Sequence, residues 1–572
     1  MAVPTAERYE DVGEIGEEGT GQEVASSPDC GLAGWRVFSA RRELRGIRED
    51  ENKPWIEVMA AAIMAEDDPG AEDDRGAETD SRNQAGPDDE RGIIRTFMHD
   101  PDTSDILQPQ GECVEDYCFN ATLEQLQAQA RAGQKLPCTA WVAEGGDGWY
   151  KPAADWLPAH GLYAALKKPR FQWRKDRASR AAPTTTATAT AGLVAVDPLI
   201  SPATSTATVT DLTLTPSPSF TNKKPRSQTD QDEAPDIERR KIFIYDLDSW
   251  NICALVATAS ESQAIALRDA FFKYLTFRSS IEASLSDGWP TFRLSLHLPY
   301  YAWRCSSIPK ADPRRNRRNH PLRGHRDVSL LNCEGGNAFL YEAQISFVLA
   351  GIDEWRWVAY CFVDSYFDED GENAAQYHKD VSDGSHTDPF EYGVADKPTE
   401  QASTFFFKVF SIRAKQITQE WETVVTNVEK SIRQHAPSHA KRPTESPAQP
   451  VTDGAIAAYG DEIRKSLDWV GTAWSVLTEL SEVLDKTSDA WADFLLVQLV
   501  KIEHLSSASR IGPSLSAIQE SFRQLERLKK NIEFMAKRCS TMKQEVNIHR
   551  RDLGRGLLAF EDGELTVAFC TA

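Results

Sequence analysis

The sequence has few of the features of a membrane or secreted protein. It contains no run of about 18 apolar residues, so no segment is predicted to cross a bilayer as a helix. The ten cysteines form no C-x-x-C pair and no regular framework, which is typical of a reducing compartment. The opening residues, MAVPTAERYEDVGEIGEEG, lack the apolar core of a signal peptide. We therefore expect a cytoplasmic protein, with the nucleus as the alternative.

The local motifs of the common enzyme classes are also missing. There is no G-x-x-x-x-G-K-[ST] phosphate loop, no H-E-x-x-H, no G-x-S-x-G and no kinase signature. Gly145, Gly146 and Gly148 lie between two short strand-like segments and indicate a hairpin turn, not a dinucleotide fingerprint. We therefore predict no catalytic residue and no cofactor, and a protein that is not an enzyme.

Basic residues are outnumbered by acidic ones. The 64 Lys and Arg against 87 Asp and Glu give a net charge of −23, which disfavours binding to nucleic acid or to an anionic membrane. Residues 1–91 hold 24 acidic and 10 basic residues and are predicted to be largely disordered, apart from one or two amphipathic helices between Trp35 and Met64. The Thr-, Ala-, Ser- and Pro-rich stretch 174–238 is predicted to be a disordered linker.

Two regions have the patterns of folded α+β structure. Residues 92–173 form a small Trp-rich unit, and residues 239–397 form a central domain whose segments KIFIYDL and NICALVATA are predicted as strands. Ser260 and Gln263 have the spacing of a capping box that opens a helix. YEAQISFVLA and WRWVAYCFV, joined by residues 351–354, predict an antiparallel hairpin. The fold class is therefore α+β, mostly antiparallel in the central domain.

Alternation in TFRLSLHLP predicts a half-buried strand. Phe292, Leu294 and Leu296 lie on one face, and Ser295 and His297 lie on the other. We expect His297 to be solvated on that polar face.

The region 400–553 is predicted to be helical and coiled-coil-like, followed by a tail over 554–572. Apolar residues recur every three or four positions over 405–433, and a heptad runs through a second helix over 455–504. A third helix begins near Pro513, because proline favours the first helical turn. Its predicted core positions are Leu515, Ile518, Phe522, Leu525, Ile532, Cys539 and Val546. Through these helices we expect self-association or binding to a protein partner.

Three further groups of residues were considered as metal or nucleophilic sites. Zinc could be held by Cys113, Cys118, Cys138 and His160, but their spacing matches no standard zinc motif. The acidic turn 363–371 does not fit a calcium loop, because tyrosines occupy the positions of its ligands. Cys253 and Cys361 lie in apolar segments and are predicted to be inert core thiols. We predict no metal site.

Charged residues of the central domain allow other interpretations. Asp364 ends an apolar strand and is predicted to cap backbone amides. The basic run 314–326 could meet phosphates, but it lacks interleaved aromatic residues, and acidic segments of the chain or of a partner compete for it. We expect no nucleic-acid partner. An enzyme with a non-local site that uses Asp364 or His297 is kept as the third functional hypothesis.

The segment YEAQISFVLAGIDEWRWVAYCFVDSYFD, residues 341–368, resembles a family of large uncharacterised fungal proteins. The resemblance covers about 239–550 and implies no reaction. Some members of that family end in a helical region similar to CorA-type magnesium transporters, and the helices at 455–504 and 513–550 resemble that cytosolic stalk. No Gly-Met-Asn motif and no membrane span follow Val546.

The leading hypothesis is a soluble intracellular interaction or scaffold protein that uses its helical C-terminal region. The motivating observations are the heptad of the third helix and the missing catalytic motifs. The resemblance implies an alternative, a pore-less relative of CorA-like metal ion transporters that reaches a membrane only through a partner.

Overall fold

A computed structural model describes most of the regions predicted to fold. The described residues are 47–66, 92–98, 108–132, 136–147, 149–151, 155–171, 236–285, 291–368, 387–391, 393–394, 401–439, 453–499 and 508–570. The segments predicted to be disordered lie outside these ranges, except for residues 47–66, which form short helices, and residues 236–238, which come directly before β3. Mixed helices and strands with long C-terminal helices confirm the α+β fold class.

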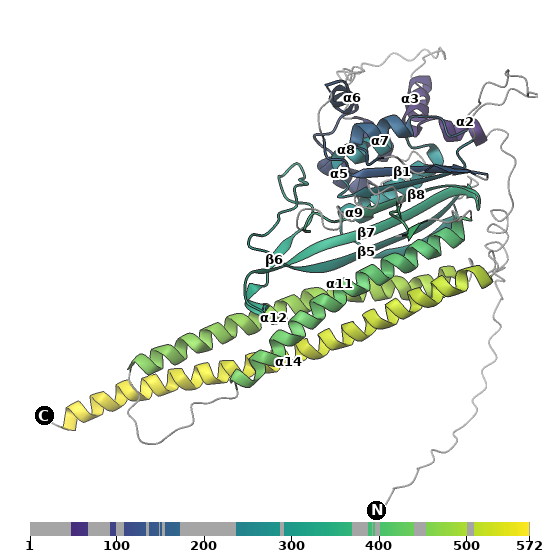
Figure 1. Cartoon of the computed structure of the whole chain (residues 1–572). Helices are drawn as coiled ribbons and strands as arrows, with labels where there is room; N and C mark the ends of the chain where they lie inside the picture. Colours follow the sequence, from purple (N-terminus) through teal and green to yellow (C-terminus); the bar gives the residue numbers. More distant parts are fainter. Residues whose placement is uncertain are drawn as a thin grey trace, which may run out of the picture.

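One mixed β-sheet forms the central layer of the molecule (Figure 1). Its strand order is β2-β1-β3-β8-β7-β5-β4, and β6 pairs with β7. The strands are β1 (Ala140–Gly146), β2 (Trp149–Lys151), β3 (Arg239–Tyr245), β4 (Ser280–Leu285), β5 (Phe292–Cys305), β6 (His325–Asp327), β7 (Ala338–Asp353) and β8 (Arg356–Val363). All pairings within this sheet are antiparallel except that of β3 with β8, which is parallel. The sheet is therefore mostly antiparallel, as predicted.

The two regions that the sequence separates, 92–173 and 239–397, share this sheet. Strand β1 pairs with β3 from Ala140 to Gly145, with Trp141 opposite Phe243. A smaller sheet joins β9 (Thr387–Asp388) to β10 (Gly393–Val394).

Helices cover both faces of the sheet. On one face lie α7 (Ala159–Leu166), α8 (Ser249–Val256) and α9 (Glu261–Leu275), with shorter helices around them. The shorter helices are α2 (Ile47–Asn52), α3 (Trp55–Glu66), α4 (Gly92–Met98), α5 (Gln108–Tyr117) and α6 (Leu123–Ala132). On the other face lie α11 (Ala402–His439) and α12 (Asp453–Asp493), and α14 (Ala508–Cys570) packs on the outside of both.

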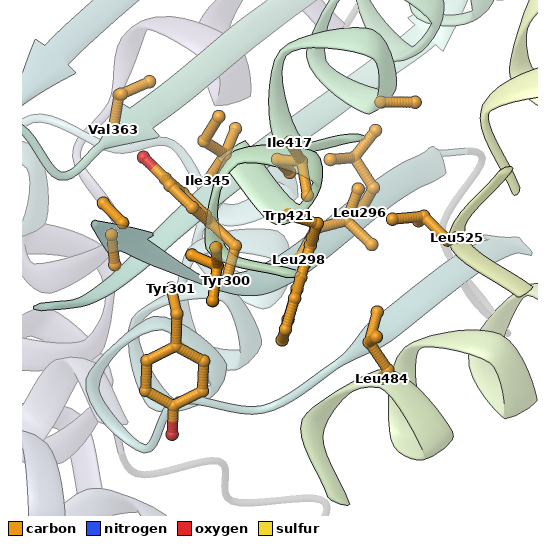
Figure 2. Packing of buried hydrophobic residues seen from close by; sticks show 14 of the residues in the cluster. Leu296, Leu298, Tyr300, Tyr301, Ile345, Val363, Ile417, Trp421, Leu484 and Leu525 are labelled. Atoms are coloured by element: carbon orange, nitrogen blue, oxygen red, sulfur yellow. The ribbon is translucent and has the colours of Figure 1, made fainter. Parts of the chain in front are cut away.

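Alternating residues of the strands divide between two hydrophobic cores. Leu296 and Leu298 of β5 point toward α11 and contact the cluster around Trp421, which also includes Leu484 of α12 and Leu525 of α14 (Figure 2). Val348 and Phe362 point the other way, into the cluster beneath α9. Because both faces of the sheet are covered, its central strands are buried on both sides.

The predicted antiparallel hairpin is confirmed, but its turn is formed by residues 354–355, and residues 351–353 of the predicted connection belong to β7. Strands β7 and β8 are antiparallel, and a register shift falls between Gly351 and Asp353. Glycine is required there, since a Cβ on Gly351 would lie 2.6 Å from the carbonyl oxygen of Arg356 and 2.8 Å from the Cβ of Trp357.

Two local predictions in the central region are wrong. NICALVATA lies mostly in helix α8 and not in a strand, because Asp248 accepts a hydrogen bond from the Asn251 amide (2.8 Å) and caps the helix. Residues 251–256 are all buried and almost all apolar, which hides the helical period. Ser260 does precede α9, but its side chain makes no capping hydrogen bond; its hydroxyl donates to Glu51 instead (3.3 Å).

The three C-terminal helices form a bundle. Glu429 of α11 pairs with Asn531 of α14 (3.2 Å), and Asp485 of α12 pairs with Lys529 of α14 (2.7 Å). The predicted core positions of the third helix lie inside this bundle: Ile518, Phe522, Leu525, Ile532, Cys539 and Val546 are buried, and Leu515 is half-buried against them. Their apolar faces are therefore covered within a single chain.

The helix boundaries differ from the predicted ones. Helix α12 ends at Asp493 in a π-helical turn, Phe494–Leu499, and α14 begins at Ala508 and carries Pro513 in its early turns. Within the described residues, no helix combines the length and apolarity needed to span a bilayer.

Candidate functional site

Two aspartates directly follow the parallel strands β3 and β8 and therefore lie at the same end of these two central strands. Asp246 follows β3, and Asp364 follows β8. Parallel strands bring their carboxyl ends together, which is where α/β proteins commonly hold ligands. Asp364 is buried and Asp246 is half-buried, so this end of the strands is the first place to look for chemistry.

Asp364 is surrounded by hydrogen-bond donors. Its carboxylate accepts from Arg314 Nη1 (2.7 Å) and Arg323 Nε (2.7 Å), and from the hydroxyl of Tyr274. The backbone amide of Gln344 also donates to it (2.9 Å). The predicted bond to a backbone amide is therefore present, but the two guanidinium groups were not predicted as its partners.

A second carboxylate completes this group, which we call the charge cluster: Tyr274, Asp312, Arg314, Arg323 and Asp364. Asp312 Oδ2 accepts from Arg314 Nη2 (2.7 Å), and Asp312 Oδ1 accepts from Arg314 Nε (2.8 Å). Arg323 Nη2 donates to the carbonyl oxygen of Tyr274 (2.7 Å). Two carboxylates face two guanidinium groups, so the charges balance.

The pKa values of the two aspartates, Asp246 and Asp364, are shifted in opposite directions. Burial would raise the pKa of Asp364, but Arg314 and Arg323 outweigh it and lower that pKa to about 2. Burial, opposed by Arg314 and reinforced by the charge of Asp364, raises the pKa of Asp246 to about 6. Asp246 accepts from the Ser365 amide (2.7 Å) and has a positive φ of 51°. The fully paired Asp364 is not available as a general acid or base.

The basic run 314–326 is divided by this arrangement. Arg314 and Arg323 point inward, and their partners are carboxylates of the same chain. Arg315, Arg317 and Arg318 are exposed on the intervening loop. The intramolecular acidic contact therefore exists and is made by Asp312 and Asp364; most of the N-terminal acidic segment lies outside the described residues.

The expected solvated position of His297 is wrong. The alternation of β5 is confirmed, but α9 covers its polar face, and His297 is fully buried. Its Nδ1 lies 2.9 Å from Ser346 Oγ, to which Gln344 Nε2 donates (3.3 Å). Burial and the charge of Lys273 lower the pKa of His297 well below its usual value, so the ring is neutral at physiological pH.

Asp364 and His297 thus lie on the same face of the sheet, joined through Gln344 and Ser346. The Nε2 atom of His297 has no hydrogen-bond partner among the described residues. This geometry leaves a neutral imidazole and an arginine-bound carboxylate, an arrangement that stabilises the sheet and offers no activated nucleophile.

The cysteines considered for zinc are free thiols. Cys118 is buried, Cys113 half-buried and Cys138 exposed, and no cluster of three or more metal-ligating side chains occurs in the described part of the chain, which includes His160. Burial raises the pKa of the Cys361 thiol to about 11.

Burial also raises the pKa of the Cys253 thiol, to about 12, so both core thiols are protonated near neutral pH.

In the acidic turn 363–371, the Asp368 carboxylate is buried and forms an ion pair with Arg304 of β5 (2.9 Å).

Comparisons with known proteins add little. No family model and no curated protein matches the chain. A solved structure described as "structure of the full-length CmaX protein" has a TM-score of 0.27 and 10% sequence identity, over 61% of this chain and 80% of that chain. A likeness this weak carries no argument, so the resemblance to a fungal family and to CorA-type helices stays a prediction.

Proposed function

We propose that the protein is an interaction or scaffold protein and that the projecting end of its helical bundle binds a second copy of the chain. We call this end the helical tip: residues 453–474 of α12 and 541–570 of α14. The observation that carries the proposal is that, among the described residues, the tip has two helices, whereas the rest of the bundle has three.

The pairing of α11 with α14 shows at which residue of α14 helix α11 ends. Asn531 of α14 pairs with Glu429 of α11, an offset of 531 − 429 = 102 residues. At that offset the end of α11, His439, is level with about residue 541 of α14. Helix α14 continues to Cys570, on the order of 40 Å further at 1.5 Å per residue. Figure 1 shows α12 and α14 running on together beyond the sheet.

Helix α12 runs antiparallel to α14 along this extension. The Lys543 ammonium lies 5.2 Å from the ring centroid of Trp474, a cation–π contact that joins the two helices at the base of the tip. Trp474 is nevertheless 41% exposed. Two packed helices without a third leave apolar area that a helix of another molecule can cover.

Helix α14 exposes further large apolar side chains at and near the tip. Phe534 is 66% exposed and Ile548 is 55% exposed. They are 14 residues apart, two heptads, and therefore share one face of the helix. This face differs from the buried heptad, so it is free for an intermolecular contact.

Charges of the tip complement each other between the two helices. Exposed Asp461 and Glu462 lie on α12, where Asp461 pairs with Arg464 (3.5 Å) and Lys465 is also exposed, and exposed Arg550 and Arg551 lie on α14. A two-fold axis that places α12 of one copy against α14 of the other brings acidic residues opposite basic ones. This complementarity favours a second copy over an unrelated helix.

Sedimentation velocity of the full chain over micromolar concentrations tests the proposal. We expect a concentration-dependent dimer that Phe534→Glu with Ile548→Glu converts to a monomer, because a charge buried at an apolar contact is costly. Ile308→Glu is the matched control, since Ile308 is 72% exposed but lies on the loop after β5, outside the helical tip. A wild-type protein that stays monomeric would refute self-association, as would a double variant that dimerises normally.

A further inference from the structure

A polar cavity of about 200 Å³ lies on the opposite side of the sheet from the bundle. It is enclosed by the turn between α2 and α3, the end of α7, the first residues of β3 and the start of α9. Its charged lining residues are Glu51, Glu57, Lys167, Lys168, Arg170 and Arg240. Four cations against two carboxylates give the lining a charge of 4 − 2 = +2.

The cationic residues of the lining differ in exposure. Lys167 and Lys168 are exposed at its rim, whereas Arg170 (4% exposed) and Arg240 (5% exposed) form its inner wall. Mobile ammonium groups at a rim and fixed guanidinium groups inside are the usual means of attracting and orienting a phosphoryl group.

Arg170 has unused donor capacity. Its Nη1 donates to Glu51 (3.1 Å), and its Nη2 donates to the carbonyl oxygens of Glu238 (2.9 Å) and Trp357 (3.3 Å). Its Nε has no hydrogen-bond partner among the described residues. An unsatisfied buried N–H is costly, but this atom is closed off from solvent, so a ligand in the cavity is attracted by the charge of Arg170 and not by its Nε.

The two buried guanidinium groups also destabilise each other. Burial, opposed by Glu51 and reinforced by Arg240, lowers the pKa of Arg170 to about 10. Burial lowers the pKa of Arg240 too, although Glu144 binds it at 2.9 Å. An additional anion would offset both effects.

The chain itself already places one anion in this corner. The Glu51 carboxylate lies at the amino end of α9, where it accepts from the Ser260 hydroxyl (3.3 Å), the Ser262 hydroxyl and Gln263 Nε2 (3.5 Å). The partial positive charge of a helix amino end and the neighbouring hydroxyl donors stabilise negative charge.

We propose that this cavity binds a small phosphate ester, with the phosphoryl group between Lys167, Lys168 and Arg170. Its volume equals the share of liquid volume of roughly seven water molecules, at about 30 Å³ each. That space suits a phosphoryl group with a short polar chain.

Isothermal titration calorimetry of the full chain with glycerol phosphate, and with glycerol as the neutral control, tests the site. We expect one site per chain for glycerol phosphate and none for glycerol. Lys167→Gln with Lys168→Gln should weaken binding about tenfold, since two favourable charges are lost. Lys537→Gln with Arg538→Gln removes two exposed cations of α14 and should leave affinity unchanged. The absence of heat at millimolar ligand, or equal affinity of both double variants, would overturn the proposal.

Hydrogen exchange and a variant of opposite sign locate the ligand. Glycerol phosphate should slow amide exchange in 47–57 and 159–171, the segments that line the cavity, and not in α14. Glu51→Gln removes a competing carboxylate, so it should bind glycerol phosphate more tightly and gain more thermal stability from it than the wild type does. Exchange that slows elsewhere, or weaker binding by a folded Glu51→Gln protein, would contradict this assignment.

Discussion

Replacing Asp364 by Asn tests the role given to the charge cluster. The substitution keeps the shape of the side chain but removes the negative charge that faces Arg314 and Arg323, both of which are almost fully buried. An asparagine amide also presents an N–H₂ group toward arginine donors if it turns the wrong way. The cluster then holds two guanidinium groups against the single carboxylate of Asp312.

The magnitude follows from two independent routes. The pKa of Asp364 lies near 2, below its usual value of 3.8, which corresponds to about 2–3 kcal/mol at about 1.4 kcal/mol per pKa unit. Removing one partner of a buried ion pair costs about 3–5 kcal/mol, because the other charge stays buried and unpaired. We therefore expect Asp364→Asn to lower the free energy of unfolding by about 3 kcal/mol.

Urea denaturation at pH 7, followed by tryptophan fluorescence and circular dichroism, measures this loss. Asp155→Asn serves as the control, because Asp155 is exposed and should change stability by less than about 0.5 kcal/mol. A loss below about 1 kcal/mol for Asp364→Asn would refute the interpretation that the charge cluster stabilises the packing of the loop between β5 and β6 against the sheet.

Three further predictions concern the body and the bundle. The folded pKa of Asp246, about 6, is higher than its usual 3.8, so the stability that its protonated form contributes is complete below about pH 4 and is lost as the pH rises through about 6. In urea titrations, Asp246→Asn should therefore be about 3 kcal/mol more stable relative to wild type at pH 8 than at pH 4. Equal pH dependence of the two proteins would contradict this. Gly351→Ala should lower the free energy of unfolding by about 1–3 kcal/mol and with it the thermal midpoint, because the added methyl group overpacks the end of β7; an unchanged midpoint would show that the hairpin relaxes freely. Ile532→Asp should melt the bundle, since it buries an unpaired charge, with loss of helical circular dichroism as the readout; retention of full helicity would mean that Ile532 is not core.

The long elements were predictable because their patterns are local. The 3.6-residue period of α11, the heptad of α14 and the β7–β8 hairpin are each encoded within a few consecutive turns or strands. Helix α8 was mistaken for a strand because an entirely buried apolar run has no polar face to reveal its period.

The candidate site was less predictable, because its partners are distant in sequence. Arg314 is 50 residues from Asp364, and no local pattern distinguishes it from the exposed Arg315 beside it. Likewise, the polar face of β5 implied solvent around His297, whereas α9 folds over it. The only local signal was Asp312, two residues before Arg314 and bound to its backbone amide (2.9 Å).

Mixed-isotope cross-linking tests the central claim that the helical tip joins two copies. Unlabelled and ¹⁵N-labelled chains are mixed, treated with a lysine cross-linker and digested. We predict hybrid peptides, one half labelled, that join Lys465 of one copy to Lys543 of the other, because both lysines are exposed on the tip. Cross-links at these lysines that occur only within one chain would contradict the account, and so would hybrid peptides confined to lysines of the sheet domain.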